Sequence, residues 1–272
     1  MPTIRAAKTL AILLLFFFAA EKLCKSQEVS SNILQRVFLI KYGTEAGASF
    51  TIDVENRQYL ITAKHLVNGI KEGDTVEIFH ENQWKSVKVR PLYVEPPDVD
   101  IIILVLPIQI SPAYPLELGI NGLYVSQTIY FLGFPYGLNL EGQTLNNGYP
   151  LPLVKRGLCS GFYFSPKKYM VALIDGINNP GFSGGPVVYV DQATKGLKVG
   201  AVVSSYRNQE DKVFRKVKRN PREKPNQKKD DEGTLVETDM IVRSNSGIII
   251  SYSINSALDV ISKNPIGPLI TK

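Results

Sequence analysis

Short runs of apolar and β-branched residues, separated by turn residues, recur along most of the chain. In the first half the runs cover residues 37–41, 49–54, 59–62, 75–79, 84–89 and 101–106, and in the second half they cover 128–132, 153–164, 170–174, 186–190, 199–206 and 247–253. Runs that are rich in Val, Ile, Thr and aromatic residues and bounded by Gly, Asn, Asp or Pro are typical of β-strands. Helical periodicity stands out only over residues 254–263, near the C-terminus.

The two groups of runs lie on either side of a proline-rich segment, Pro107 to Pro115, which can cross from one lobe to another. We therefore predict an all-β protein with two antiparallel six-stranded β-barrels and a short C-terminal helix. The first barrel is expected to cover residues 35–112. The second is expected to cover residues 116–264, with the helix at 254–263 closing it.

The first residues follow a different pattern. Arg5 and Lys8 precede an apolar run from Thr9 to Ala20. A basic start followed by about a dozen apolar residues is typical of a secretory signal peptide, and it is short for a membrane span. We predict that residues 1–26 are a cleaved leader and that the mature protein is secreted or periplasmic. An uncleaved leader, or a lipid anchor on Cys24, is the alternative and the one route to a membrane.

Removal of this leader changes the charge and the cysteine inventory. The chain has 272 residues and a formal net charge of +6, of which the leader supplies +3. The remaining charge is a weak electrostatic footprint, so we predict no nucleic-acid binding. Only Cys159 remains in the mature chain, within a strand-like run, and it is expected to be a buried thiol. No metal-ligand cluster stands out, and no cofactor is predicted.

One segment interrupts the last two strands of the second group. Residues 207–232 contain ten basic and six acidic residues and two prolines, with few apolar side chains. Such a composition buries too little surface to offset the entropy of ordering. We predict a long exposed insertion that forms a solvated loop. A surface for anionic lipid or for a partner, and a site of self-cleavage, are the alternatives.

Ser183 provides the strongest local signal for chemistry. It lies between glycines in Gly181-Phe182-Ser183-Gly184-Gly185, directly before an apolar strand. Hydrolysis of an acyl bond needs an exposed hydroxyl beside backbone N–H groups that can hold a developing oxyanion, and glycine permits the dihedral angles of such a loop. A glycine-rich turn with an incidental serine is the alternative interpretation.

A serine nucleophile needs a base, and the chain has only two histidines. His65 follows an apolar strand, whereas His80 lies in a polar turn and is expected to be a solvated hairpin tip. Asp100 directly precedes the apolar run 101–106. At this position the carboxylate can be shielded from water and can accept a hydrogen bond from an imidazole. Asp98 has prolines as neighbours and is expected to be solvated. We therefore select His65 and Asp100.

The order of these residues along the chain distinguishes between families. Esterases and lipases with the G-x-S-x-G pattern place their histidine after the serine, but this chain has no histidine after His80. The subtilisin order would need an early acid such as Asp53 and an α/β pattern. The order His65, Asp100, Ser183 is that of the chymotrypsin clan.

Three segments together resemble trypsin-like serine peptidases, most closely the bacterial HtrA/Deg-type protease domain without a PDZ module. Residues 61–65 resemble the histidine motif of that family, residues 100–104 its aspartate motif and residues 175–186 its serine loop. The resemblance extends over residues 35–264 and implies an active site in the cleft between two barrels.

The resemblance implies a serine endopeptidase that acts on polypeptides without a cofactor. Ser183 is then the nucleophile that forms an acyl-enzyme, His65 is the general base and acid, and Asp100 orients the imidazole. The backbone N–H groups of Gly181 and Ser183 are expected to form the oxyanion hole. Ile177 corresponds to the floor of the substrate pocket, which implies a preference for aliphatic or small side chains.

Val203 and Ser204 are expected to border that pocket, on a strand edge over 199–205 that can pair with an extended substrate. Phe182 replaces the small polar residue that is usual before the nucleophile. This departure supports a second hypothesis, a catalytically silent protease-like module that binds peptides. A structural surface protein with an accidental motif is a third. The oligomeric state is left open.

Overall fold

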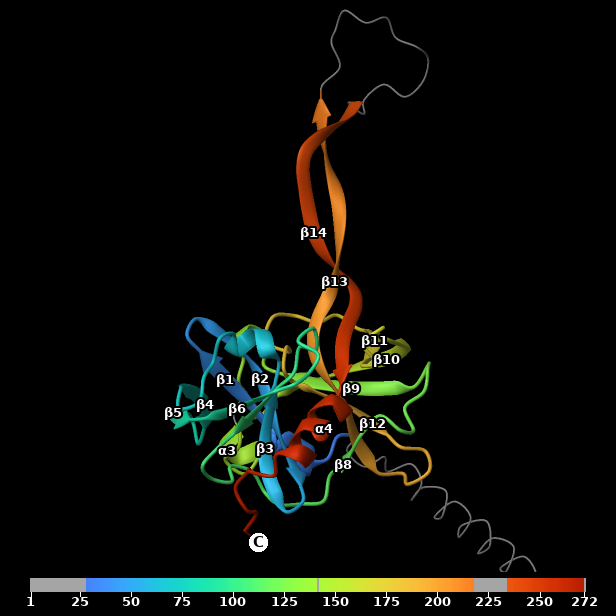
Figure 1. The fold of residues 1–272 in the computed structure, drawn as a ribbon. Coiled ribbons are helices and arrows are strands. Elements are labelled where there is room, and N and C mark those ends of the chain that lie inside the picture. The colour runs from blue at the N-terminus through green and yellow to red at the C-terminus, as the bar shows by residue number, and fades with distance from the viewer. Residues whose placement is uncertain (1–27, 141, 218–233, 272) are drawn as a thin grey trace, which may run out of the picture.

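The computed structural model describes residues 28–140, 142–217 and 234–271, and the predicted leader, residues 1–26, lies outside them. The described residues form two sheets of seven strands each, with few and short helices (Figure 1). No helix in these ranges is long and apolar enough to cross a membrane. The predicted all-β architecture with two lobes and a short C-terminal helix is confirmed.

The first lobe contains β1 (Val37–Tyr42), β2 (Glu45–Val54), β3 (Arg57–Thr62), β4 (Thr75–His80), β5 (Gln83–Lys88), β6 (Arg90–Tyr93) and β7 (Ile102–Val105), with a short helix α2 (Ser31–Leu34) and a 3-10 turn η1 (Lys64–Val67). The strand order is β5-β4-β1-β2-β3-β7-β6. Only the buried Val89 separates β5 from β6. The two edge strands are therefore one bent segment, which curls the sheet towards a barrel. β6 was not among the predicted strands.

The second lobe contains β8 (Glu117–Leu118), β9 (Thr128–Gly133), β10 (Leu153–Phe164), β11 (Met170–Asp175), β12 (Pro186–Val190), β13 (Leu197–Val217) and β14 (Thr234–Ser253), with η2 (Pro135–Gly137), α3 (Gly142–Leu145) and the closing helix α4 (Asn255–Lys263). β12 pairs with both β9 and β13, so β12, β9, β10, β11, β14 and β13 close into a ring. This ring is the predicted six-stranded barrel. The seventh strand, β8, adds parallel to β13.

β13 and β14 continue past the barrel as a two-stranded arm that rises away from both lobes (Figure 1). The prediction of a solvated loop is wrong for residues 207–217, which belong to β13 and pair from residue 208 onwards with residues 234–245 of β14. The local composition gave no sign of this pairing because the partner strand lies beyond the charged tract. Opposite charges also pair across the strands, as between Glu210 and Arg243, where Nε and Oε1 are 3.0 Å apart. Residues 218–232 of the predicted insertion lie outside the described ranges.

Arg36 holds the segment that crosses between the lobes. Its side chain is 1% exposed, and Nη2 donates to the carbonyl oxygen of Tyr114 at 2.7 Å and to Oδ2 of Asp53 at 2.6 Å. A buried charge is stable only when it is paired and hydrogen-bonded. The crossing segment is therefore fixed to the first lobe at a defined point, which sets where the second lobe begins.

Candidate active site

The side chains of His65 and Asp100 are in direct contact in the first lobe. His65 lies in η1, just after β3, and Asp100 lies just before β7. The backbone N–H of His65 donates to Oδ1 of Asp100 at 2.9 Å, and ring Nδ1 is 2.6 Å from Oδ2. Because a carboxylate only accepts hydrogen bonds, Nδ1 carries the proton. The other ring nitrogen, Nε2, is then an acceptor that can take a proton.

A hydroxyl group from the second lobe completes the bonding of Asp100. Ser204 of β13 donates from Oγ to Oδ2 of Asp100 at 2.6 Å. Burial raises the pKa of Asp100, but hydrogen bonds from His65 and Ser204 together outweigh it and hold the pKa below its ordinary value of 3.8. The carboxylate is therefore charged at neutral pH and can stabilise a positive charge on the imidazole.

Ser183 lies in the loop that leads into β12, and its hydroxyl donates to the backbone carbonyl of Ser204 at 2.8 Å. Ser204 thus contacts Asp100 through its side chain and Ser183 through its carbonyl. The structure brings the two predicted partners of His65 to this one residue. Within the described ranges, no hydrogen bond joins His65 to Ser183 directly.

Two glycines set the path of the chain around Ser183. Gly181 has φ +105° and Gly184 has φ +83°, a region that residues with a side chain rarely adopt. A Cβ on Gly181 would lie 2.1 Å from the carbonyl oxygen of Phe134, and one on Gly184 would lie 2.1 Å from that of Ala48. Even a methyl group at either position would displace the serine loop.

The serine loop is bonded to the first lobe through backbone atoms. The N–H of Ala48 in β2 donates to the carbonyl oxygen of Ser183 at 2.9 Å. The carbonyl oxygen of Ala48 accepts a hydrogen bond from Oγ1 of Thr62, the last residue of β3, at 2.7 Å. Ala48 therefore links the serine loop to the strand end from which His65 follows.

Two backbone N–H groups beside Ser183 lack an acceptor within the described ranges. Those of Gly181 and Ser183, the predicted oxyanion hole, have no hydrogen-bond acceptor in the part of the chain that the structure describes. Phe182, which lies between them, is fully buried, and its ring packs edge-on against Phe131 with centroids 5.1 Å apart. The aromatic ring therefore anchors the loop in the core and leaves both N–H groups available to a ligand oxygen.

Lys155 of β10 also holds this loop, although it was not among the candidate residues predicted from the sequence. Its Nζ donates to the carbonyl oxygen of Ile177 at 2.8 Å and to Oδ1 of Asn179 at 2.6 Å, and it lies 5.1 Å from the ring centroid of Phe182. Burial lowers the pKa of Lys155, and no carboxylate in the described ranges forms an ion pair with it. One feature of the sequence could have identified Lys155. Side chains alternate between the two faces of a strand, and Lys155 occupies a position of β10 that faces inwards, where a lysine is unusual.

The residues predicted to border the substrate pocket differ in exposure. Ile177 follows β11, and its side chain is 61% exposed, so it is accessible to a ligand. Val203 is fully buried, and its N–H and C=O groups bond to Gly185 and Gly184. Val203 can therefore shape a pocket only by positioning its neighbours. Ser204 is also buried, but its carbonyl group accepts the hydrogen bond from the Ser183 hydroxyl.

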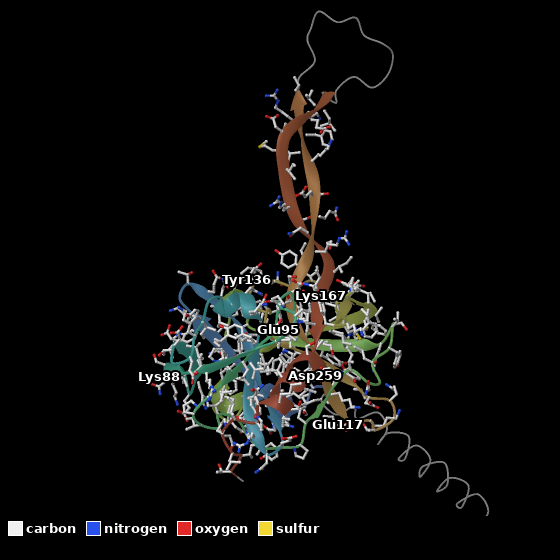
Figure 2. All side chains as sticks on the ribbon, viewed as in Figure 1. Lys88, Glu95, Glu117, Tyr136, Lys167 and Asp259 are labelled. Carbon is white, nitrogen blue, oxygen red and sulfur yellow. The ribbon has the colours of Figure 1, made fainter. Side chains whose placement is uncertain are left out.

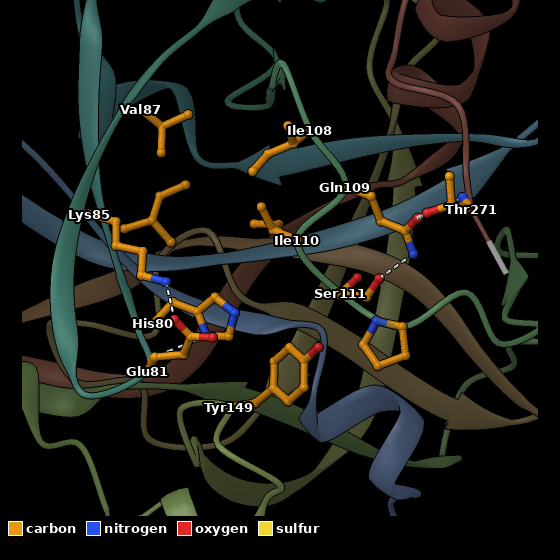
Figure 3. A pocket seen from close by; sticks show the side chains of 12 residues that line it. His80, Glu81, Lys85, Val87, Ile108, Gln109, Ile110, Ser111, Tyr149 and Thr271 are labelled. Atoms are coloured by element: carbon orange, nitrogen blue, oxygen red, sulfur yellow. Dashed lines mark hydrogen bonds and ion pairs between the residues drawn. The ribbon is translucent and has the colours of Figure 1, made fainter.

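His80 lies elsewhere, at the β4–β5 hairpin as expected, where it pairs with Gln83, but the expectation that it is solvated is wrong. Its ring stacks on Tyr149 with centroids 5.0 Å apart, and burial lowers its pKa. Both residues line a cavity of about 560 Å³ beside Ile108 and Ser111 (Figure 3). None of the candidate catalytic residues lines this cavity. Tyr149, from the segment between α3 and β10, covers the histidine, a contact that a local turn pattern cannot show.

Two other residues set aside in the sequence, Asp98 and Cys159, are found as expected. Asp98 is exposed and pairs with Lys167, which Figure 2 labels near the base of the arm. Cys159 is a buried free cysteine, and burial raises the pKa of its thiol. In the described ranges, no group of three or more His, Cys, Asp or Glu side chains is placed to hold a metal ion.

Comparison with known proteins bears on the fold and the family. Residues 47–197 match the family model of the trypsin-like peptidase domain. The active form of the Rv3671c protease from M. tuberculosis superposes with a TM-score of 0.51 at 16% identity, over 88% of this chain and 85% of that one. The HtrA-type protease AlgW, solved with a tripeptide, superposes with a TM-score of 0.54 at 16% identity, over 86% of this chain and 61% of that one. No curated protein matches by sequence.

Proposed function

Because this chain belongs to the trypsin-like peptidase family, we propose that it is a serine endopeptidase that cuts polypeptides through an acyl-enzyme on Ser183. His65 serves as general base and then as general acid, and Asp100 orients its imidazole. The main support is the series of hydrogen bonds from His65 through Asp100 and Ser204 to Ser183. These bonds supply the contact between base and orienting carboxylate that a catalytic triad needs, and they bring the Ser183 hydroxyl to the same residue, Ser204, that bonds to the carboxylate.

Attack begins when the Ser183 hydroxyl turns from the Ser204 carbonyl to Nε2 of His65, by rotation about its Cα–Cβ bond. Catalytic hydrogen bonds are often formed only once substrate is bound. Oγ of Ser183 bonds to the scissile carbonyl carbon as His65 takes the hydroxyl proton, and the carbonyl oxygen becomes an oxyanion. The free N–H groups of Gly181 and Ser183 then stabilise it, by roughly 3–4 kcal/mol for each donor.

His65 next gives its proton to the leaving amine, which departs and leaves the acyl group on Ser183. Water attacks the ester with His65 again as base, and the free enzyme returns. The Asp100 carboxylate, whose pKa is held below its ordinary value, stays charged throughout and stabilises the imidazolium. Ile177, an exposed apolar side chain, is the floor of the substrate pocket that the family resemblance implies, and it favours aliphatic or small side chains before the scissile bond.

We infer the setting of this reaction from the sequence pattern of residues 1–26, which is that of a leader for export. The substrates are therefore polypeptides outside the cytoplasm. A mature chain without its leader would contain Cys159 alone, buried in the second lobe. Its folding would then be independent of disulfide formation and of the redox state of that compartment.

The test is cleavage of a fluorescently labelled unfolded protein by the purified mature chain. We expect fragments from the wild type and none from Ser183→Ala, whose melting temperature should match that of the wild type. Cleavage by the alanine variant at the wild-type rate would contradict the proposal.

The catalytically silent peptide-binding module is supported by one observation, the Ser183 hydroxyl bonded to Ser204 rather than to His65. It predicts that the wild type and Ser183→Ala bind the unfolded protein equally and that neither cuts it.

A further inference from the structure

The arm begins at the candidate active site. β13 has 21 residues, so it is about 70 Å long at about 3.3 Å per residue. Its inner part, up to Ser204, is buried in the second lobe, and from Ser205 outwards it is mostly exposed. Ser204 is the residue that contacts both Ser183 and Asp100. One continuous strand therefore runs from the nucleophile to the far end of the described arm.

One edge of this strand is unpaired along the arm. β12 pairs with β13 only as far as Val202, and β8 pairs with it at Lys198 and Val199. Beyond Val203, β14 follows one side of β13, and no other strand in the described ranges follows the opposite side. Figure 1 shows the arm standing alone there. A strand edge of this kind presents a row of backbone N–H and C=O groups to any extended chain.

Several apolar side chains of the arm are also exposed to solvent. A two-stranded hairpin on its own is marginally stable in water. Side chains project from both faces of the arm into open space (Figure 2). The large apolar side chains of the arm that are more than half exposed are Phe214, Leu235, Met240, Ile241 and Val242. A third strand would add main-chain hydrogen bonds and cover part of this surface.

The cross-strand pairs indicate which feature of a partner the arm can recognise. Lys212 faces Ile241, Asp211 faces Val242 and Arg215 faces Val236. Each pair sets a charged residue beside an apolar one, and both signs of charge occur. No single face therefore selects one kind of side chain. Recognition then depends on the main chain, as in the addition of a peptide strand to a sheet edge.

We propose that the free edge of β13, from Ser205 to Val217, is an exosite that binds the part of a polypeptide substrate N-terminal to the scissile bond. This inference rests on the proposed function. The substrate is added as an antiparallel strand, which is also the orientation of β12 and β14 relative to β13. An antiparallel strand runs from the arm towards Ser183, so its N-terminal part lies on the arm. The favoured substrates are unfolded chains with roughly ten or more residues before the cleavage site.

Binding to the full-length Ser183→Ala protein tests the exosite without turnover. Labelled peptides share one cleavable core and carry N-terminal extensions of about two, five and ten residues. We expect affinity to rise about tenfold or more from the shortest to the longest extension. The same extensions placed on the C-terminal side should give no gain. An equal gain on either side, or none with length, overturns the exosite.

N-methylation of the peptide backbone distinguishes strand pairing from other contacts. Alternate residues of an antiparallel strand bond to a given neighbour, and β13 keeps one register against β14 from Asn208 to Lys212, between two irregularities. In the part of the peptide that pairs with this stretch, methylation of every second amide should therefore abolish the gain with length in one phase and leave it in the other. Equal losses in both phases would contradict strand addition. An arm that instead pairs with a second copy of the chain would give a dimer in sedimentation and no gain with peptide length, which also overturns the proposal.

These binding results are separable from the proposed function. A wild type that cuts short peptides but shows no gain with length refutes the exosite and leaves the peptidase intact. A wild type that cuts nothing, while Ser183→Ala shows the predicted gain and the alternation, refutes the peptidase and leaves the exosite as the binding surface of a silent module.

Discussion

The two halves of the candidate site are held in different ways. In the first lobe, hydrogen bonds to a side chain hold the site, since Asp100 accepts two from His65, one of them from its backbone N–H, and one from Ser204, which reaches it from the second lobe. In the second lobe, the backbone around Ser183 is held by glycines that leave room for neighbouring carbonyls and by the buried ring of Phe182. Removal of a functional group from the first half should therefore lower activity with little effect on the stability of the fold. Addition of atoms to the second half should instead displace the loop that carries Ser183.

Asp100→Asn should have the largest effect in the first half. The amide can donate to Nδ1 of His65 and so favours the tautomer in which Nε2 carries the proton and cannot accept one. We expect kcat to fall about 10⁴-fold, as when the aspartate of the Ser-His-Asp triad of a digestive serine peptidase is replaced by asparagine, with the melting temperature little altered. Peptide hydrolysis and thermal unfolding of the same preparation check both parts. A loss of less than tenfold would mean that Asp100 does not orient the base.

Gly184→Ala should impair the second half by moving the loop. The added methyl would lie 2.1 Å from the carbonyl oxygen of Ala48, at a positive φ. We expect a loss of stability of about 2 kcal/mol or more and a drop in kcat/KM of about 10²-fold from misplacement of Ser183. Gly161→Ala is the matched control, because a Cβ there meets nothing within 4 Å. Similar melting temperatures for the two variants would argue against a rigidly held loop.

Lys155→Met tests the cation beneath the loop with a smaller expected effect. Loss of the hydrogen bonds to Ile177 and Asn179 should lower kcat about tenfold with little change in KM, because the loop then samples unproductive arrangements. Lys155→Arg keeps the charge and should restore part of the rate. A role in packing alone would leave kcat unchanged in both variants and alter only the melting temperature.

Asp191 lies outside the candidate site, and its replacement should have the smallest effect. It is a reference for Asp100 because hydrogen bonds lower the pKa of both carboxylates. Hydrogen bonds from Lys198 and from the backbone of Thr194 and Ala193 lower the pKa of Asp191 to about 2. A depressed pKa stabilises the fold fully above the unfolded value, near 4, and the contribution is lost as the pH falls towards 2. Asp191→Asn should therefore flatten the decline of stability between about pH 4 and pH 2. An unchanged slope would contradict the pairing with Lys198.

Much of this arrangement could be predicted from the sequence, because strand alternation and chain order are local or countable features. The single histidine at a strand end, the glycines around Ser183 and the lack of a histidine after His80 led to the three candidates, and the structure connects them through Ser204. The strand segments and the closing helix were also recognisable from their periodicity.

The remaining features depend on contacts between distant segments. The arm forms because residues 208–217 pair with residues 234–245, which follow the charged segment in the sequence. The average composition of residues 207–232 predicts a loop and does not show this pairing. Lys155 bonds to carbonyl and amide oxygens, which leave no charge pattern in the sequence. His80 is covered by Tyr149 from the other lobe. None of these contacts is encoded in the residues adjacent to the group it affects.

A fluorophosphonate reacts with a serine hydroxyl that a neighbouring base activates. Mass spectrometry of the labelled protein therefore reports whether His65 activates Ser183. We predict a single adduct on Ser183 in the wild type, and a rate of labelling at least about 10³-fold lower in His65→Ala. An adduct on another residue, or equal rates of labelling in the two proteins, would contradict the account.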